Sequence, residues 1–162
     1  MSIISTSRLV LRSWNPDDAA PLFAIYSDPE VTRHIPHVHL KDLDAARAKV
    51  REMMDLERKN GCTLWAVMRE EELIGVCGFR TPDELGFAFR RDAWGNGYAQ
   101  EAAIACIAWA ARRGVRRILA SVRPENAGSR RVLDRLGFTD TGKRSEDGLW
   151  CIYERLTASA AL

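Results

Sequence analysis

The stretch "RRDAWGNGYAQEA", residues 90–102, places two glycines directly before a run of small apolar residues. That run continues to Gly114, is apolar on most sides and ends in basic residues, so it predicts a helix packed against a sheet. Gly95 and Gly97 then stand at the helix N-terminus, where free backbone N–H groups gather. Glycine backbone and the positive end of the helix dipole both favour a phosphate there. A plain tight turn is the alternative, because a single G-x-G pattern is weak support for phosphate binding.

The segments on both sides of this turn predict a mixed sheet with helices on its faces. Residues 62–69, 72–80 and 84–90 are three short runs rich in strand-forming residues, and turn-like positions separate them, so they predict an antiparallel meander. The other predicted elements are a strand at 8–14, helices at 15–29 and 43–61, a loop at 34–42, a strand at 116–123, a short helix at 125–138 and a closing hairpin at 138–156.

Length and composition limit the class of protein. The 162 residues predict one domain, residues 1–162, with a flexible tail over the last few residues. A hydrophobic fraction of 46% and a charged fraction of 28% are typical of a soluble globular protein, and a net charge of +2 argues against nucleic-acid binding. The longest apolar run, Ala102 to Ala111, is too short to span a membrane, and the first residues do not resemble a secretory signal. We therefore expect a cytoplasmic protein with no membrane partner.

Two motifs together resemble a known family. Residues 86–102 ("GFAFRRDAWGNGYAQEA") followed by residues 123–138 ("RPENAGSRRVLDRLGF") resemble the two central motifs of the GCN5-related N-acetyltransferases (GNAT), especially the ribosomal-protein N-terminal, RimJ/RimL-like branch. Residues 6–31 extend the resemblance, which thus covers nearly the whole chain. It implies the α/β acyl-CoA N-acyltransferase fold, with a mixed central sheet of about seven strands that is splayed in the middle and flanked by about four helices.

The resemblance also implies a binding site for acetyl-CoA and no metal. In the family, the strand that matches residues 85–89 pairs with the pantetheine amides, as an added strand would, and the loop that matches residues 94–98 holds the pyrophosphate. The thioester would lie in the gap between residues 86–89 and 117–122, with its carbonyl near the N–H of Phe89. The implied cofactor-binding residues are Phe87, Ala88, Phe89, Trp94, Gly95, Asn96, Gly97, Tyr98, Ala99, Asn126, Ser129 and Arg131.

Several of these residues also have an ordinary structural interpretation. Trp94 and Tyr98 could pack beside the cofactor or simply cover the edge of the core. Asn126 and Ser129 could serve the reaction or cap a helix. Arg131 could meet the phosphates of CoA or be an exposed helix charge.

The chain departs from the family pattern at two positions. Asp92 stands where the looser consensus has Gln or Arg, so pyrophosphate binding would depend on backbone N–H groups. Leu133 stands where many members carry a tyrosine that protonates the departing thiolate. By resemblance to the ribosomal-protein branch, Ser129 is the candidate proton donor, and Asn126 lies with it near the sulfur and the pantetheine.

The general base is an open question at the level of sequence. All three histidines, His34, His37 and His39, fall in the loop that borders the acceptor pocket in this family. They could be ordinary surface-loop residues, which is the preferred interpretation, or supply a base, for which we single out His37, or bind a metal. Glu101 fits a supporting role on its helix better than catalysis. Four scattered cysteines without a C-x-x-C pair predict buried reduced thiols rather than zinc ligands.

Together these observations predict an acetyl-CoA-dependent N-acetyltransferase in which a primary amine attacks the thioester within a ternary complex. An α-amine with a pKa near 7.8 is neutral in about one molecule in seven at pH 7, whereas lysine is neutral in about one in 2,500. A protein or peptide N-terminus is therefore the first choice of acceptor. A small-molecule amine such as a polyamine, amino acid or antibiotic is the second, and a non-catalytic acyl-CoA sensor is the alternative from another class. We expect a monomer or homodimer.

Overall fold

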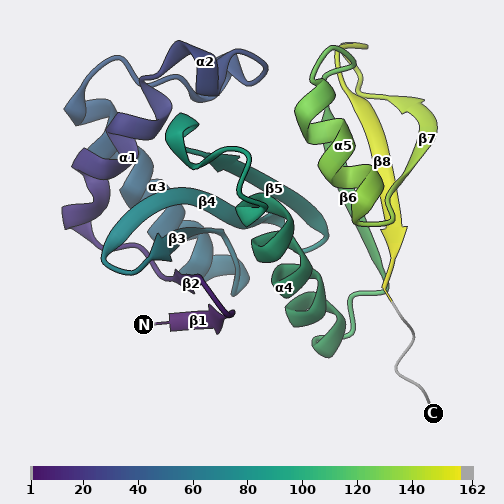
Figure 1. The fold of residues 1–162 in the computed structure, drawn as a ribbon, viewed down its shortest axis with the longest axis horizontal. Coiled ribbons are helices and arrows are strands. Elements are labelled where there is room, and N and C mark those ends of the chain that lie inside the picture. Colours follow the sequence, from purple (N-terminus) through teal and green to yellow (C-terminus); the bar gives the residue numbers. More distant parts are fainter. Residues whose placement is uncertain (1, 158–162) are drawn as a thin grey trace.

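The structure, a computed structural model, describes residues 2–157, and the tail predicted at the C-terminus lies outside them. The described residues form an eight-stranded mixed sheet with the order β1-β2-β3-β4-β5-β6-β8-β7 (Figure 1). The strands are β1 (Ser2–Ser5), β2 (Val10–Arg12), β3 (Leu64–Arg69), β4 (Glu72–Thr81), β5 (Glu84–Phe89), β6 (Arg117–Val122), β7 (Thr139–Arg144) and β8 (Cys151–Leu156). The predicted meander is confirmed, because β3, β4 and β5 pair antiparallel in sequence order.

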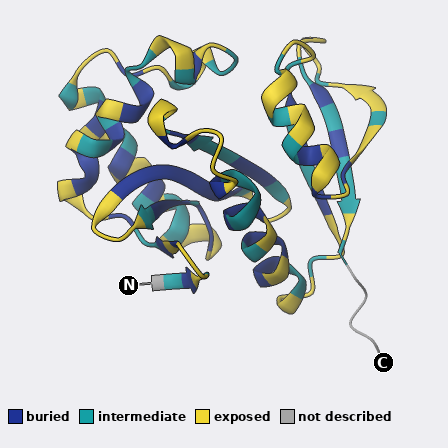
Figure 2. Ribbon diagram, viewed as in Figure 1, coloured by how far each residue is buried: buried dark blue, intermediate teal, exposed yellow. Residues whose placement is uncertain are grey.

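Helices cover both faces of the sheet. They are α1 (Ala19–Tyr26), α2 (Pro29–Thr32), α3 (Leu43–Asn60), α4 (Tyr98–Arg112) and α5 (Ala127–Arg135), with short 3₁₀ turns η1 (Pro16–Asp18), η2 (Pro36–Val38) and η3 (Arg91–Ala93). α1 and α3 bury Leu22 and Met53 with Val76 of β4 on one face. α4 buries Cys106 with Phe79 on the other face. Figure 2 shows the resulting buried band along β4 and along β6 and β8.

Local sequence explains where the long helix α3 begins and ends. The Asp42 side chain accepts a hydrogen bond from the N–H of Ala45 at 2.7 Å, which caps the first turn. Gly61 ends the helix in the left-handed conformation, at φ 72°, which glycine adopts without steric cost. These two signals bracket a helix whose bounds match the prediction from sequence to within one residue.

The sheet is splayed between β5 and β6, as the family resemblance implied. In the described residues the two parallel strands pair at one place, Glu84 with Leu119, where the Leu119 N–H donates to the Asp83 carbonyl at 2.8 Å. Beyond that pair the strands part, and the portion made of β6, α5, β7 and β8 stands apart from the end of β5 (Figure 1). The edge of β5 from residue 86 onward is therefore available to another partner.

The structure adds one strand and one helix to the seven strands and four helices expected. β1 is four residues long and follows no alternating pattern, so its sequence carries little strand signal. α2 is a single turn that begins at Pro29, where the Asp28 side chain caps the N–H of Glu30 at 3.0 Å. An Asp-Pro pair at the end of a helix indicates a stop, which hid the start of the next turn.

Two further predictions concern cysteines and membranes. Cys62, Cys77, Cys106 and Cys151 are all buried and free, as predicted. None of the helices within residues 2–157 is long and apolar enough to cross a membrane.

Candidate active site

A cavity of about 650 Å³ lies where β5 and β6 part. Its walls come from β5, the turn before α4, the start of α5, and the segment around α2. Gly86 and Ala88 face α1 and α3, whereas Phe87 and Phe89 pack on the α4 side. The cavity thus reaches both faces of the sheet through the splay.

The exposed edge of β5 presents peptide groups to this cavity. The Arg90 N–H donates to the Ile74 carbonyl of β4 at 2.8 Å. Because alternate residues of a strand direct their N–H groups to opposite sides, those of Phe87 and Phe89 point toward the gap. A peptide-like chain could pair with them as an added strand.

The turn between β5 and α4 supplies a second set of free N–H groups. Gly97 is the N-cap of α4, with φ 77°, and Gly95 has φ 78°. The first helical hydrogen bond runs from the Glu101 N–H to the Gly97 carbonyl at 3.0 Å, so the N–H groups of Tyr98, Ala99 and Gln100 lack an acceptor within the helix. A Cβ at Gly95 would meet no atom within 4 Å, and one at Gly97 only an Arg8 nitrogen at 3.7 Å. Both glycines therefore leave open space where an anion could approach the helix N-terminus.

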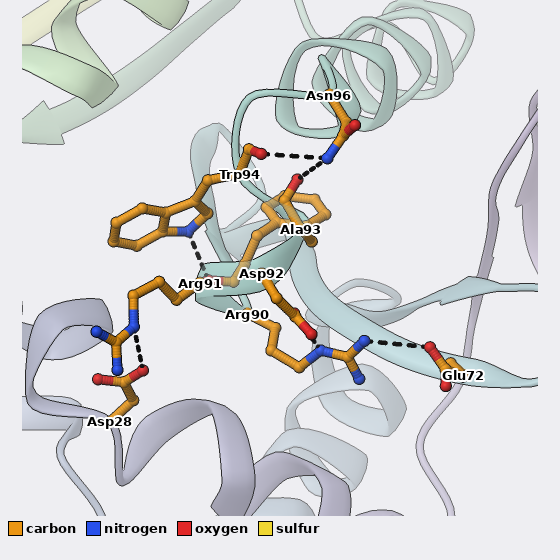
Figure 3. Close-up of polar contacts among 9 residues, drawn as sticks. Asp28, Glu72, Arg90, Arg91, Asp92, Ala93, Trp94 and Asn96 are labelled. Atoms are coloured by element: carbon orange, nitrogen blue, oxygen red, sulfur yellow. Dashed lines mark hydrogen bonds and ion pairs between the residues drawn. The ribbon is translucent and has the colours of Figure 1, made fainter.

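Side-chain hydrogen bonds hold this turn in shape (Figure 3). The Trp94 indole N–H donates to the Phe89 carbonyl at 2.9 Å, which ties the turn to the end of β5. The Asn96 amide donates to the carbonyls of Ala93 at 3.0 Å and Trp94 at 3.1 Å. Trp94, Gly95, Gly97, Tyr98 and Ala99 line the cavity, whereas Asn96 braces the turn from behind.

Two arginines and three acids surround the same turn (Figure 3). Asp92, the departure from the family consensus, is paired with Arg90 at 2.5 Å, and Arg90 also meets Glu72 at 3.1 Å. The negative charge of Asp92 is thereby compensated at the surface. Arg91 pairs with Asp28, the N-cap of α2, at 3.0 Å, so the turn before α4 is linked to the helix on the opposite rim of the cavity.

α5 brings the second motif to the cavity. Asn126 is the N-cap: its side-chain oxygen accepts from the Ser129 N–H at 3.1 Å, and its NH₂ donates to the Ser129 hydroxyl at 3.1 Å. Both residues also line the cavity, so capping and a role in the site are compatible. Leu133 lines it too and is 2% exposed, so an apolar side chain occupies the place of the family tyrosine.

The arginines of α5 divide into two groups. Arg131 and Arg135 line the cavity and are exposed. Arg130 instead donates to the Tyr153 hydroxyl at 3.2 Å and to the Pro124 carbonyl at 3.0 Å, which anchors α5 to the sheet. Arg131 therefore lies where an anion in the cavity could reach it.

The structure separates the three histidines. His34 lines the cavity, and the His39 Nδ1 lies 3.0 Å from the Thr32 hydroxyl. His37, the candidate base, is not part of the cavity wall and packs edge-on against Trp150, with ring centroids 5.7 Å apart. Desolvation lowers the pKa of His37, and the nearby positive charges of Arg80, Lys49 and Arg123 lower it further. Within residues 2–157 no group of three His, Cys, Asp or Glu side chains is placed to hold a metal ion.

Glu101 lies in the first turn of α4 and acts on the fold. It accepts hydrogen bonds from the hydroxyls of Thr6 at 2.6 Å and Ser7 at 3.3 Å, and from the N–H and Nε of Arg8 at 3.0 and 2.7 Å. Partial burial raises the pKa of this carboxyl, but the hydrogen bonds and the charge of Arg8 outweigh it, and the pKa is lowered. Glu101 thus fixes the N-terminus of α4 to the turn between β1 and β2.

Sequence reasoning missed the part of the cavity wall that faces α1 and α3. Arg80 at the end of β4, Trp150 before β8, and Arg33 after α2 all line it. The one signal in the sequence was Gly86 in the middle of a strand, because an interior strand glycine often marks close approach by another group. Here that group is the guanidinium of Arg80, which lies against it.

Comparisons with known proteins agree with this fold. The family described as the acetyltransferase (GNAT) domain matches residues 8–139. The uncharacterized N-acetyltransferase p20 of Bacillus licheniformis is 33% identical over 151 residues, which cover 88% of this chain and 85% of that protein. The chain belongs to the GNAT family, and it is a GNAT-type N-acetyltransferase.

Two solved structures show the same fold at lower identity. RimL, a ribosomal L7/L12 alpha-N-protein acetyltransferase, superposes with a TM-score of 0.84 and 20% identity, covering 96% of this chain and 95% of that one. MccE, a microcin C7 self-immunity acetyltransferase in complex with acetyl-CoA and AMP, superposes with a TM-score of 0.80 and 15% identity, covering 93% of both chains.

Proposed function

We propose that this N-acetyltransferase uses acetyl-CoA and transfers the acetyl group to an α-amine, the N-terminal amine of a protein or peptide being the first candidate. The observation that carries the proposal is the union, in one cavity, of a free strand edge, a glycine turn at a helix N-terminus, and an opening on the opposite face of the sheet. In this proposal the cofactor lies on the α4 and α5 side, and the amine enters from the side of α2.

Each portion of acetyl-CoA would meet a different part of the chain. The N–H groups of Tyr98, Ala99 and Gln100, with the open backbone of Gly97, would bind the pyrophosphate. The peptide groups of Phe87 and Phe89 would pair with the pantetheine and, at one N–H, polarise the thioester carbonyl. Residues Ala88, Trp94 and Asn96 shape or brace this path, and Arg131 would approach a phosphate.

The chain itself would contribute three things to the chemistry. It would position the two substrates, donate one hydrogen bond to the thioester carbonyl, and donate one proton to the departing sulfur. Bound acetyl-CoA supplies an activated acyl group on a sulfur whose thiol has a pKa of about 8.5, a fairly good leaving group. As the amine attacks and the C–S bond breaks, Ser129, held by Asn126 on the cavity wall, would donate its hydroxyl proton to the departing sulfur and regain, through water, the proton that the amine loses. Leu133 keeps this part of the wall apolar, and so we assign no role to a tyrosine.

The proposed α-amine acceptor fits a site without a strong base. His37 packs against Trp150 outside the cavity wall, and His34 is the imidazole on that wall. An α-amine needs less help than lysine to lose its proton at neutral pH, because its pKa is lower by about 2.6 units. The RimJ/RimL-like motifs support the same acceptor, and the likeness to RimL supports the fold it requires.

The test is release of CoA thiol from acetyl-CoA with two acceptor panels, peptides with free N-termini and small amines, preceded by an acetyl-CoA binding titration. We expect micromolar binding and transfer to peptides with a free α-amine, but not to the same peptides after N-terminal blocking. Transfer to small amines alone would replace the proposed acceptor. Binding without any transfer would favour an acyl-CoA sensor, and no binding would contradict the proposed site.

A further inference from the structure

A guanidinium forms part of the cavity on the side where the acceptor would enter. Arg80 is the second-last residue of β4, and an added Cβ on Gly86 would come within 2.8 Å of the Arg80 Cζ and 2.9 Å of both terminal nitrogens. The missing side chain of Gly86 thus makes room for the guanidinium on the face of β5 that looks toward α1 and α3. The Arg80 side chain is 35% exposed, so its charge is partly shielded from water but open to a ligand.

The ion pair of Arg80 leaves most of its hydrogen-bonding capacity free. Its nearest carboxylate oxygen belongs to Glu84, at 3.6 Å from one terminal nitrogen. Glu84 also accepts a hydrogen bond from the Ser121 hydroxyl at 3.2 Å. A guanidinium has five N–H donors arranged for two-point contact with a carboxylate, and a single long ion pair does not satisfy them.

The surroundings of Arg80 contain further positive charge. Arg33 also lines the cavity, and the guanidinium of Arg123 lies over the Trp150 ring at 4.6 Å from its centroid. The buried Nε of Arg123 has no hydrogen-bond partner among the described residues.

Apart from Glu84, which is paired with Arg80, the acidic groups nearby lie toward the surface. Glu30 is an exposed residue of the cavity rim, and Asp147 is an exposed residue whose pKa the charge of Arg123 helps to lower, after hydrogen bonds from Ser145 and Leu149. Arg80, Lys49 and Arg123 all lower the pKa of the neighbouring His37, after desolvation. Positive potential therefore prevails around the inner part of the acceptor side.

We propose that the acceptor carries a carboxylate close to its reactive amine and that Arg80 binds this carboxylate, so that Arg80 determines acceptor specificity. The inference rests on the proposed function, because it concerns the acceptor of the same reaction. The carboxylate could belong to a free amino acid or to an acidic residue next to a peptide N-terminus. In both cases Arg80 would anchor one end of the acceptor while the amine reaches the thioester.

Polycationic amines fit this side of the cavity poorly. A polyamine or aminoglycoside would bring several ammonium groups toward Arg80 and Arg33, and the nearest carboxylate, that of Glu84, is already paired with Arg80. The same positive charge would favour the neutral form of a single bound amine, which is the form that attacks. Arg80 would thus select for an acceptor with one amine and one anion.

The experiment compares acceptors that differ only in charge. One pair is an α-amino acid and its carboxamide, and a second pair is a peptide beginning Ser-Asp and one beginning Ser-Asn. We expect kcat/KM to be about ten- to a hundredfold higher for the carboxylate member of at least one pair, since charge-assisted contacts contribute at this level. The pair that shows the preference identifies the source of the carboxylate.

Two variants and a control connect the preference with Arg80. Arg80→Gln should reduce the carboxylate preference to less than threefold, mainly through the KM of the acceptor. Gly86→Ala keeps the charge but should displace the guanidinium, and it should reduce the preference as well. Arg47→Gln changes net charge equally on the exposed surface of α3, where Arg47 pairs with Asp44, and should leave the preference intact.

Outcomes against the inference are distinct from failure of the proposed function. Equal rates for carboxylate and amide acceptors in the wild type, a preference for polyamines, or an unchanged preference in Arg80→Gln would each overturn the role of Arg80 while transfer itself stands. No thiol release with any acceptor would contradict the proposed function and, with it, this inference.

Discussion

At the scale of single residues, Gly97 and Gly114 share a backbone conformation but lie at opposite ends of α4, and of the two only Gly97 lines the cavity. Their φ angles are 77° and 83°, and neither would force an added Cβ into another atom. Alanine in this left-handed conformation costs about 1–2 kcal/mol at either position. We predict that Gly97→Ala and Gly114→Ala lower the free energy of unfolding by similar amounts in urea titrations.

Only Gly97→Ala should also weaken acetyl-CoA binding. Its Kd for acetyl-CoA should rise by about tenfold, because the added Cβ would stand where the pyrophosphate approaches the helix. Calorimetric titration of both variants measures the difference. If both bind acetyl-CoA like the wild type, Gly97 is a plain turn residue and the proposed phosphate site is wrong.

Ser129 offers a second prediction at this scale, because its backbone and its hydroxyl do different things. The helix cap uses the Ser129 N–H, which alanine keeps. Ser129→Ala should therefore change unfolding free energy by less than about 1 kcal/mol and acetyl-CoA affinity by less than about twofold. It should lower kcat by about tenfold or more if the hydroxyl donates a proton to the sulfur. An unchanged kcat, measured by thiol release, would remove Ser129 from the chemistry.

At the scale of elements, Glu101 joins the start of α4 to the turn before β2. Because its pKa is lowered in the folded protein, its contribution to stability is present above the unfolded value of about 4.3 and is lost as the pH falls through the folded pKa. Glu101→Gln should lower unfolding free energy by about 1–3 kcal/mol at pH 7, and the difference from wild type should shrink below pH 4. Glu52→Gln, which removes an exposed i,i+3 pair with Lys49, should cost less than about 0.5 kcal/mol. Equal losses in both variants would contradict the linking role.

The contact between Arg91 and Asp28 joins two elements on opposite rims of the cavity. Arg91 is 59% exposed at the side chain, so the pair should contribute less than about 1 kcal/mol to stability. Asp28→Asn keeps an oxygen to cap α2 but removes the charge. We expect a KM for the acceptor about three- to tenfold higher with acetyl-CoA affinity nearly unchanged, and no additional effect when Arg91→Gln is combined with it. Additive effects of the two substitutions would show that the residues act independently.

The elements of the fold also show which parts of the structure and of the candidate site were predictable from sequence. The bounds of α3 and α4 lie within two residues of those predicted, because Gly61, Gly97 and Gly114 are clear local signals, whereas the cap at Asp42 was recognised only in the structure. The part of the cavity proposed to bind the cofactor was predicted from motifs that are contiguous in sequence. The part proposed to admit the acceptor was not, because Arg80, Trp150 and Arg33 come from three distant segments that only the tertiary fold brings together. His37 was named as the candidate base from loop membership alone, second to a plain surface-loop role, and its actual environment depends on Trp150.

At the scale of the whole molecule, one pair of residues joins β5 to β6 in the described sheet, although the core continues from one side of the splay to the other. Leu85 and Cys106 share a buried cluster with Ile118 and Tyr153, so the splayed edge is an opening in a continuous core rather than a division between two cores. The opening costs strand hydrogen bonds that water must replace in the free protein. A ligand that pairs with both the edge of β5 and the start of α5 would restore them.

This arrangement predicts a specific pattern of hydrogen exchange. Acetyl-CoA should slow amide exchange at Phe87 and Phe89 by about tenfold or more, because their N–H groups face the gap and would gain an acceptor. Arg90, whose N–H already donates to Ile74, should change only with the global stability and serves as the internal reference. Residue-resolved exchange with and without saturating acetyl-CoA measures the difference. Uniform slowing across β5 would indicate mass-action stabilisation by binding elsewhere, whereas selective slowing at alternate residues would require a strand-like partner along this edge.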